Sequence, residues 1–327
     1  MRMAMAEADV GDDQREGDPT TRRLEAMAAE LLGMDGALYV PSGTMANLIA
    51  VLVHTRECPG LVVETGSHIA TVEAPGIAAL TRARPYLVAG KYGVMASADV
   101  EAAFDRAAAE GVTVGVLCLE NTHNNAGGTV LPEPDMKRLV ALARRVGAAV
   151  HVDGARIFNA SVATGVPAPK LVERADSMMF CLSKGLGAPV GSVLCGTSDF
   201  IARARPVRIW CGGGMRQSGV IAAAGIVALQ DYPQRFAIDH ANARRFAAGL
   251  SRFPAFDIDL RSVQTNMVYA GVTDPEFDPA AFERHCYERG VWVRPDRKRI
   301  RFVLHHQVVP EDVDRAVEVI GNFFAKF

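Results

Sequence analysis

The sequence has 327 residues, a length that favours one large domain joined to a smaller one. Hydrophobic residues make up 49% of the chain and charged residues 22%, which excludes an intrinsically disordered or fibrous protein. The 35 basic and 37 acidic side chains leave a formal net charge of −2. No basic stretch could neutralise a phosphate backbone, so we expect a globular protein that does not bind nucleic acid.

The first eighteen residues are acidic and lack the apolar core of a secretory signal. The longest apolar stretch, Val220 to Leu229, is about half of the ~20 residues that cross a bilayer. Six cysteines are scattered without a C-x-x-C pair, which is typical of buried free thiols in a reducing compartment. We therefore expect a cytoplasmic protein with no membrane partner.

Short apolar runs rich in β-branched residues alternate with helical patterns along most of the chain. The predicted strands are Ala37–Val40, Leu61–Glu64, Pro85–Val88, Val114–Leu119, Ala148–Val152, Ser177–Cys181 and Val190–Cys195. Helices are predicted between them at Met45–His54, Ala98–Glu110 and Pro134–Val146. Because most of these strands are apolar on both faces, the pattern predicts an α/β fold: a mostly parallel seven-stranded sheet covered by helices.

The pattern changes after Gly219. Predicted helices at Val220–Leu229, Arg235–Ser251, Ala280–Arg289 and Glu311–Phe324 surround two predicted strands at Asn266–Ala270 and Arg299–His305. This order indicates a smaller α+β unit. We place the large domain at residues 1–233 and the small C-terminal domain at 234–327.

Two polar motifs follow neighbouring predicted strands. The glycine motifs of dinucleotide-binding, P-loop and serine-hydrolase proteins are absent, and no Cys/His cluster indicates a metal site. Asp153 follows one strand, and Lys184 lies 31 residues further along, after the next. The carboxyl ends of such strands are where open α/β sheets bind ligands. A lysine amine and a carboxylate placed there suit pyridoxal 5′-phosphate, which needs a Schiff-base partner and an acid at its pyridine nitrogen.

Two further segments could bind the phosphate of that cofactor. Residues 41–47, Pro-Ser-Gly-Thr-Met-Ala-Asn, join a strand to a helix and present backbone amides at the helix N-terminus. An ordinary helix cap by Ser42 or Thr44 explains the same residues. Downstream, Arg216 follows three consecutive glycines, which could place a guanidinium on the phosphate or simply form a mobile loop.

Five motifs, in this order and at these spacings, resemble the low-specificity L-threonine aldolases: PSGTMAN, LENTHN, HVDGARIFNA, CLSKGLGAPVGS and GGGMRQSG. The resemblance runs from about Val10 to the C-terminus. It implies the fold type I of pyridoxal phosphate enzymes. It also implies retro-aldol cleavage of L-threonine or L-allo-threonine to glycine and an aldehyde, by a homotetramer built as a dimer of dimers.

The resemblance also implies roles for individual residues. For the cofactor these are Lys184 as the Schiff-base lysine, Asp153 at the pyridine nitrogen, Ser42, Gly43 and Thr44 at the phosphate, Arg216 on the neighbouring subunit's phosphate, and His68 stacked on the ring. For the substrate they are Arg156 and Arg301 at the carboxylate and His123 near the side chain. Bond cleavage requires a base at the β-hydroxyl group, and His68 or His123 is the candidate.

Other activities share the same cofactor residues. A β-eliminating lyase or a racemase would also use Lys184, Asp153 and the phosphate loop. The family's N-terminal Arg-Ser-Asp-Thr segment, whose serine binds the substrate carboxylate, has no counterpart in the nine residues before Val10. A weakly active oligomer is therefore a third interpretation of the sequence.

Overall fold

The computed structural model describes residues 1–324, and these divide into two compact units. The first comprises residues 1–125 and 131–232, and the second comprises residues 126–130 together with the chain from Pro233 onward. Each unit has its own sheet. The short segment 126–130 belongs to the second unit, although more than a hundred residues separate it from Pro233, where the rest of that unit begins. Local sequence patterns do not predict this membership.

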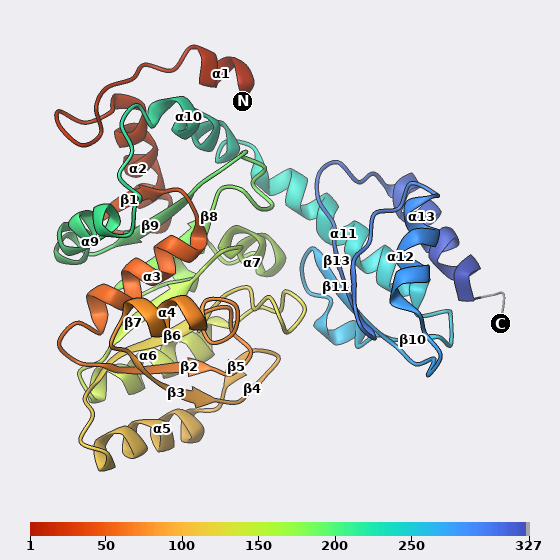
Figure 1. Ribbon diagram of the computed structural model, residues 1–327, viewed down its shortest axis with the longest axis horizontal. Coiled ribbons are helices and arrows are strands. Elements are labelled where there is room, and N and C mark those ends of the chain that lie inside the picture. The colour runs from red at the N-terminus through yellow and green to blue at the C-terminus, as the bar shows by residue number, and fades with distance from the viewer. Residues whose placement is uncertain (325–327) are drawn as a thin grey trace. The chain divides into compact units, whose positions relative to one another are not determined.

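A seven-stranded sheet forms the centre of the first unit (Figure 1). Its strands, in spatial order, are β1 (Gly36–Val40), β9 (Ser192–Gly196), β8 (Ser177–Cys181), β7 (Ala149–Asp153), β6 (Val114–Glu120), β2 (Gly60–Glu64) and β3 (Arg84–Val88). The pairs from β8 to β3 are parallel, whereas β9 runs antiparallel to both of its neighbours. The predicted mostly parallel α/β fold is confirmed.

The helices of the first unit are α1 (Arg2–Ala6), α2 (Pro19–Leu32), α3 (Gly43–His54), α4 (Ala74–Leu80), α5 (Ser97–Ala109), α6 (Glu133–Arg145), α7 (Ile157–Thr164), α8 (Ala168–Leu171), α9 (Ser198–Trp210) and α10 (Gly219–Ala228). They cover this sheet, except for α1, which packs on α10. A small hairpin, β4 (Gly90–Lys91) and β5 (Val94–Met95), lies between β3 and α5. The sequence patterns predicted α3, α5, α6 and α10. They missed the short helices α1, α4, α7 and α8, and also α2 and α9, whose apolar residues are interrupted by charged ones.

Helix α3 packs on the sheet and begins at the carboxyl ends of its parallel strands. Its apolar side chains Ile49 and Val53 pack with Phe200 of α9 and with Leu38 and Leu194 of the sheet. The helix begins directly after β1, where the side chain of Ser42 accepts a hydrogen bond from the backbone N–H of Met45 at 3.2 Å. Burial of one whole face therefore fixes the N-terminus of α3 at the carboxyl end of the parallel strands.

The second unit is an antiparallel sheet with helices. Its strands, in spatial order, are β10 (Phe256–Asp257), β11 (Met267–Val272), β13 (Arg299–Val303) and β12 (Pro295–Asp296), and its helices are α11 (Tyr232–Leu250), the 3-10 turn Leu260–Ser262, α12 (Pro279–Tyr287) and α13 (Pro310–Phe324). Phe282, Phe246 and Ile320 are fully or almost fully buried in its core. In the described part of the chain, helices α1 to α13 all lack a stretch both long and apolar enough to span a bilayer.

Candidate active site

A cavity of about 330 Å³ lies in the first unit, at the carboxyl ends of β7 and β8. Its lining is Pro41, Ser42, Gly43, Thr44, Asn47, His68, Glu73, Asp153, Ala155, Met179, Cys181, Ser183, Lys184, Pro189, Val190 and Gly191. Six of the residues singled out from the sequence are in this set. They come from four separate parts of the chain, and the parallel sheet gathers them at one edge.

Asp153 and Lys184 face this cavity from neighbouring strands. Asp153 is the last residue of β7, and its side chain is only 3% exposed. Its carboxylate accepts hydrogen bonds from the side-chain amide of Asn47 at 2.8 Å and from the backbone N–H of Ala155 at 3.0 Å. Lys184 follows the end of β8. Two donors hold the carboxylate in place beside an amine, as binding of a pyridine nitrogen next to a Schiff base requires.

The N-terminus of α3 forms another wall of the cavity. Gly43 is its first residue, and a Cβ atom there would lie 2.8 Å from Cys181 Sγ and 2.9 Å from Met179 Cε. Only glycine allows α3 to approach β8 this closely. Backbone N–H groups at the start of this twelve-residue helix are suited to bind an anion, and the Thr44 side chain lines the same wall.

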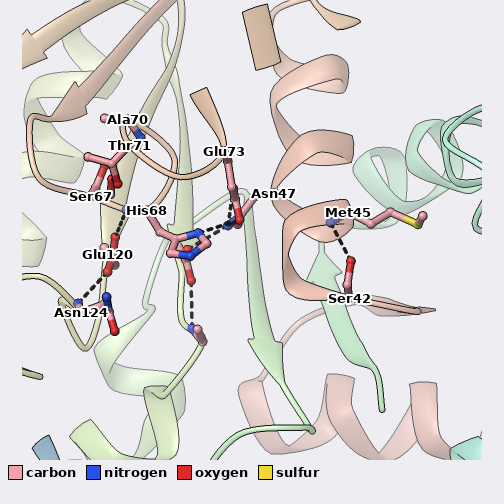
Figure 2. Close-up of polar contacts among 12 residues, drawn as sticks. Ser42, Met45, Asn47, Ser67, His68, Ala70, Thr71, Glu73, Glu120 and Asn124 are labelled. Carbon is pink, nitrogen blue, oxygen red and sulfur yellow. Dashed lines mark hydrogen bonds and ion pairs between the residues drawn. The ribbon is translucent and has the colours of Figure 1, made fainter. Parts of the chain in front are cut away.

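His68 enters the cavity from the loop after β2 (Figure 2). Its Nδ1 atom lies 2.8 Å from Oε1 of Glu73, and the Asn47 amide donates to the same carboxylate at 3.0 Å. The hydrogen bond to Glu73 raises the pKa of His68 above its ordinary value, and this outweighs the opposing effect of partial burial. Glu73 therefore orients the imidazole and favours its protonated form.

His123 is paired with a different carboxylate. Its Nε2 atom lies 2.8 Å from Oε2 of Glu64, and the histidine is only 3% exposed. Burial acts to lower the pKa of His123, but the hydrogen bond to Glu64 and the charge of Glu120 outweigh it, so the pKa is raised. Burial likewise acts to raise the pKa of Glu64, yet the hydrogen bond to His123 lowers it overall. Both shifts favour a buried ion pair.

Glu120 connects the loops that carry the two histidines. It ends β6, and its carboxylate accepts the backbone N–H of His68 at 2.6 Å and that of Asn124 at 2.7 Å, as Figure 2 shows. Burial, together with the negative charge of Asp153, raises the pKa of Glu120. Its two backbone contacts fix the loop of His68 against the loop of His123.

The cavity lining, within residues 1–324, does not include the other predicted site residues. Arg156 is the N-cap of α7, directly after the lining residue Ala155. Arg216 lies in the loop before α10, where its guanidinium contacts the carboxylate of Asp12 at 2.7 Å. Arg301 belongs to β13 of the second unit, opposite Tyr269 of β11.

Four polar residues of the site were not singled out from the sequence: Asn47, Glu64, Glu73 and Glu120. A signal existed for two of them. Glu64 and Glu120 are acidic residues at the carboxyl ends of buried strands, the same position that drew attention to Asp153. Glu73 precedes α4 in a loop and lies beside His68 only because of the tertiary fold.

The residues present fit pyridoxal 5′-phosphate. The amine of Lys184, the carboxylate of Asp153 and the anion-binding start of α3 line one cavity. The close approach of α3 to β8 that Gly43 permits brings the helix N-terminus to the cavity wall, where its backbone N–H groups can bind a phosphate group. An imidazole, that of His68, stands in the same cavity and could cover one face of a planar ring.

Comparisons with known proteins identify the family of the chain. A family model described as beta-eliminating lyase matches residues 1–273. The low-specificity L-threonine aldolase 1 of Arabidopsis thaliana is 42% identical over 96% of this chain and 89% of its own length. The low specificity L-threonine aldolase of Escherichia coli K12 is 39% identical over 100% of this chain and 96% of its own.

A solved structure has the same fold. The threonine aldolase of Leishmania major superposes with a TM-score of 0.77, covering 93% of this chain and 88% of its own, at 19% sequence identity. The extent and identity of the sequence matches go beyond a shared fold. The chain belongs to the beta-eliminating lyase family and, within it, to the low-specificity L-threonine aldolases.

Proposed function

We propose that this chain is a pyridoxal phosphate-dependent aldolase that cleaves L-threonine, L-allo-threonine and related β-hydroxy-α-amino acids to glycine and an aldehyde. The observation that carries the proposal is the single cavity lined by Lys184, Asp153, His68 and the start of α3. The relatives named as low-specificity L-threonine aldolases support it, because they match the chain almost from end to end.

Each cavity residue has a task in this proposal. Lys184 anchors the cofactor covalently, and Asp153 binds its pyridine nitrogen through a carboxylate that Asn47 holds in place. The N-terminus of α3 binds the phosphate, with Ser42, Gly43 and Thr44 as the contacting residues. When bound, the cofactor supplies a protonated ring that accepts the electron pair released on Cα as the bond to Cβ breaks.

The reaction also needs a base and a carboxylate clamp. The base takes the β-hydroxyl proton while Cβ leaves as the aldehyde, and proton return to Cα gives glycine. His68 and His123 are the candidates, and His68 is the one that lines the cavity. A proton can be accepted only by the neutral imidazole, so Glu73 influences the pH at which His68 becomes competent. Arg156 and Arg301 are proposed to bind the substrate carboxylate, which orients the breaking bond.

We also propose that the enzyme is a cytoplasmic homotetramer, a dimer of dimers in which Arg216 reaches the phosphate in a neighbouring subunit. The loop that carries Arg216 is flanked by large exposed apolar side chains, Trp210 at 69% and Val220 at 42% exposure. Apolar surface of this kind is typical of a protein interface. The six free cysteines favour a reducing compartment. Light scattering of the purified holoenzyme would measure the assembly.

The test is product analysis with a matched pair of lysine variants. We expect wild-type protein with L-threonine to release glycine and acetaldehyde in equal amounts, and Lys184→Ala to release neither. Lys170→Ala is the control, because Lys170 is exposed and pairs only with Glu173 at 3.1 Å in the described contacts. Release of ammonia and an oxo acid by the wild type would indicate β-elimination instead, and inversion at Cα without cleavage would indicate a racemase. Either outcome, or glycine release by Lys184→Ala, would overturn the proposal.

A further inference from the structure

A continuous chain of polar side chains crosses the core of the first unit and ends at Asp153. His54 Nε2 lies 2.8 Å from the hydroxyl of Ser177, and that hydroxyl lies 2.9 Å from His151 Nδ1. His151 Nε2 lies 3.1 Å from the side-chain oxygen of Asn47, whose amide nitrogen lies 2.8 Å from Asp153. We call these five residues the core relay. Ser177 and His151 are fully buried, so water does not substitute for these contacts.

The chemistry of the end groups fixes the direction of every hydrogen bond in the core relay. Asn47 must donate from its amide nitrogen, because both groups facing that nitrogen are carboxylates, Asp153 and Glu73. Its oxygen then accepts from Nε2–H of His151. A neutral imidazole with a proton on Nε2 has a bare Nδ1, which accepts from the hydroxyl of Ser177. The Ser177 oxygen in turn accepts from Nε2–H of His54.

Both histidines are neutral, as this assignment requires. Burial lowers the pKa of His54 to about 4 and that of His151 to about 3. Each imidazole therefore carries one N–H group at neutral pH. All four donors point the same way, toward Asp153. Hydrogen bonds aligned in this manner polarise one another, and the last donor, the Asn47 amide, becomes a stronger partner for a negative charge.

The core relay begins near the amino end of β8, whereas the cofactor cavity lies at the carboxyl ends of β7 and β8. Ser177 is the first residue of β8, whereas Asp153 is the last residue of β7. His54 ends α3, stacks on Phe200 with ring centroids 4.9 Å apart, and lines a second cavity of about 880 Å³. Helix packing would be satisfied by apolar side chains at these positions. Ser177 and His151 are polar side chains in a dry core, where they are costly unless they serve another purpose, whereas His54 lies at the edge of this second cavity.

We propose that His54, Ser177 and His151 are positioning residues of the active site: through Asn47 they stabilise the charged carboxylate of Asp153, and thereby the protonated pyridine nitrogen of the bound cofactor. This inference rests on the proposed function, because it takes Asp153 as the partner of that nitrogen. None of the three touches substrate. Their contribution is to keep the electron-accepting form of the ring populated, which a lone carboxylate in a partly dry cavity does less well.

The test compares two replacements of His151 that have similar size. In His151→Gln the side-chain amide keeps a donor at the position of Nε2, whereas His151→Met keeps the volume and loses the donor. The first readout is the ¹⁵N chemical shift of the pyridine nitrogen in protein loaded with ¹⁵N-labelled pyridoxal 5′-phosphate. The second is the dissociation constant of the cofactor from the apoprotein. We expect His151→Met to shift the signal toward the unprotonated form and to weaken cofactor binding about ten-fold, and His151→Gln to restore most of both.

Two further variants protect the test from a folding artefact. Ser177→Ala removes one link with almost no change in volume, and we expect the same ¹⁵N shift in the same direction. His240→Met is the control, because His240 is an equally buried neutral histidine that belongs to the second unit. We expect it to lower stability without moving the signal. A ¹⁵N shift unchanged in both His151→Met and Ser177→Ala would overturn the inference, whereas wild-type protein that binds no cofactor would overturn the proposed function instead.

Discussion

At the scale of single residues, the two histidines of the site differ in the carboxylate that faces them. Glu73 pairs with His68, and Glu64 pairs with His123. Both contacts raise the pKa of the histidine, so in each case the neutral form that can act as a base appears at higher pH than for an isolated imidazole. The pairing makes the two candidates distinguishable by mutation of the partner.

We expect Glu73→Gln to move the acidic limb of the kcat profile to lower pH. Glutamine keeps an acceptor for His68 but removes the negative charge that stabilises its protonated form, so the imidazole loses its proton earlier as the pH rises. Glu64→Gln is the comparison variant. The measurement is kcat for L-threonine between about pH 4.5 and 8.5, which is about two units either side of the ordinary histidine pKa. A limb that moves only in Glu64→Gln would assign the base to His123.

At the scale of elements, the site depends on how closely the start of α3 approaches β8. A Cβ atom at position 43 would lie 2.8 Å from Cys181 Sγ, whereas one at Gly76, within α4, would meet nothing within 4 Å. We expect Gly43→Ala to cost about 1–3 kcal/mol through overpacking and to weaken cofactor binding by displacing the helix N-terminus. The measurement is the cofactor dissociation constant together with the urea midpoint.

Gly76→Ala is the matched control for this substitution. Because the site is open and helical, we expect it to leave cofactor binding unchanged and to stabilise the protein by about 0.5–1 kcal/mol. Cofactor affinity that is equal in Gly43→Ala and Gly76→Ala would contradict the view that α3 provides the phosphate site.

At the scale of the whole molecule, buried neutral histidines make stability depend on pH. Burial lowers the pKa values of His54 and His240 to about 4 and that of His151 to about 3. The unfolded chain binds protons at these groups from about pH 6.5 downward, and the folded chain does not. We expect the free energy of unfolding to fall as the pH drops from 6.5 toward 4, by up to about 1.4 kcal/mol per pH unit for each histidine.

The two histidines that pair with carboxylates change the free energy of unfolding in the opposite direction with pH. The pKa values of His68 and His123 are raised, so their contribution is complete below pH 6.5 and is lost as the pH rises above it. Urea unfolding of the apoprotein at pH 5, 6, 7 and 8 measures both effects. We expect His240→Gln to reduce the loss of unfolding free energy at acidic pH and to leave the basic side unchanged. If the free energy of unfolding of that variant fell as steeply toward acidic pH as that of the wild type, this account would be contradicted.

Local sequence patterns predicted most strands of the central sheet and the polar residues that follow them. Buried parallel strands are continuous runs of apolar residues, so β2, β6 and β8 could be predicted from such runs in the sequence. A lysine and an aspartate after consecutive parallel strands meet at one edge of the sheet, as the sequence predicted for Asp153 and Lys184, and both line the same cavity. Helices α2 and α9 were not predicted, because charged residues interrupt their apolar ones along the chain.

The tertiary structure alone decided which polar groups stabilise the site. Glu73 reaches His68 from a loop before α4, and Asn47 lies on α3 between three partners: His151, Asp153 and Glu73. The spacing of these residues along the sequence follows no helical or strand period, so no sequence pattern predicts their contacts. A hydrogen bond depends on distances of a few tenths of an ångström, and these are set by the packing of α3 on the sheet. Motifs at strand ends therefore predicted the kind of site, whereas the packing of α3 on the sheet sets the hydrogen bonds that hold its charged groups.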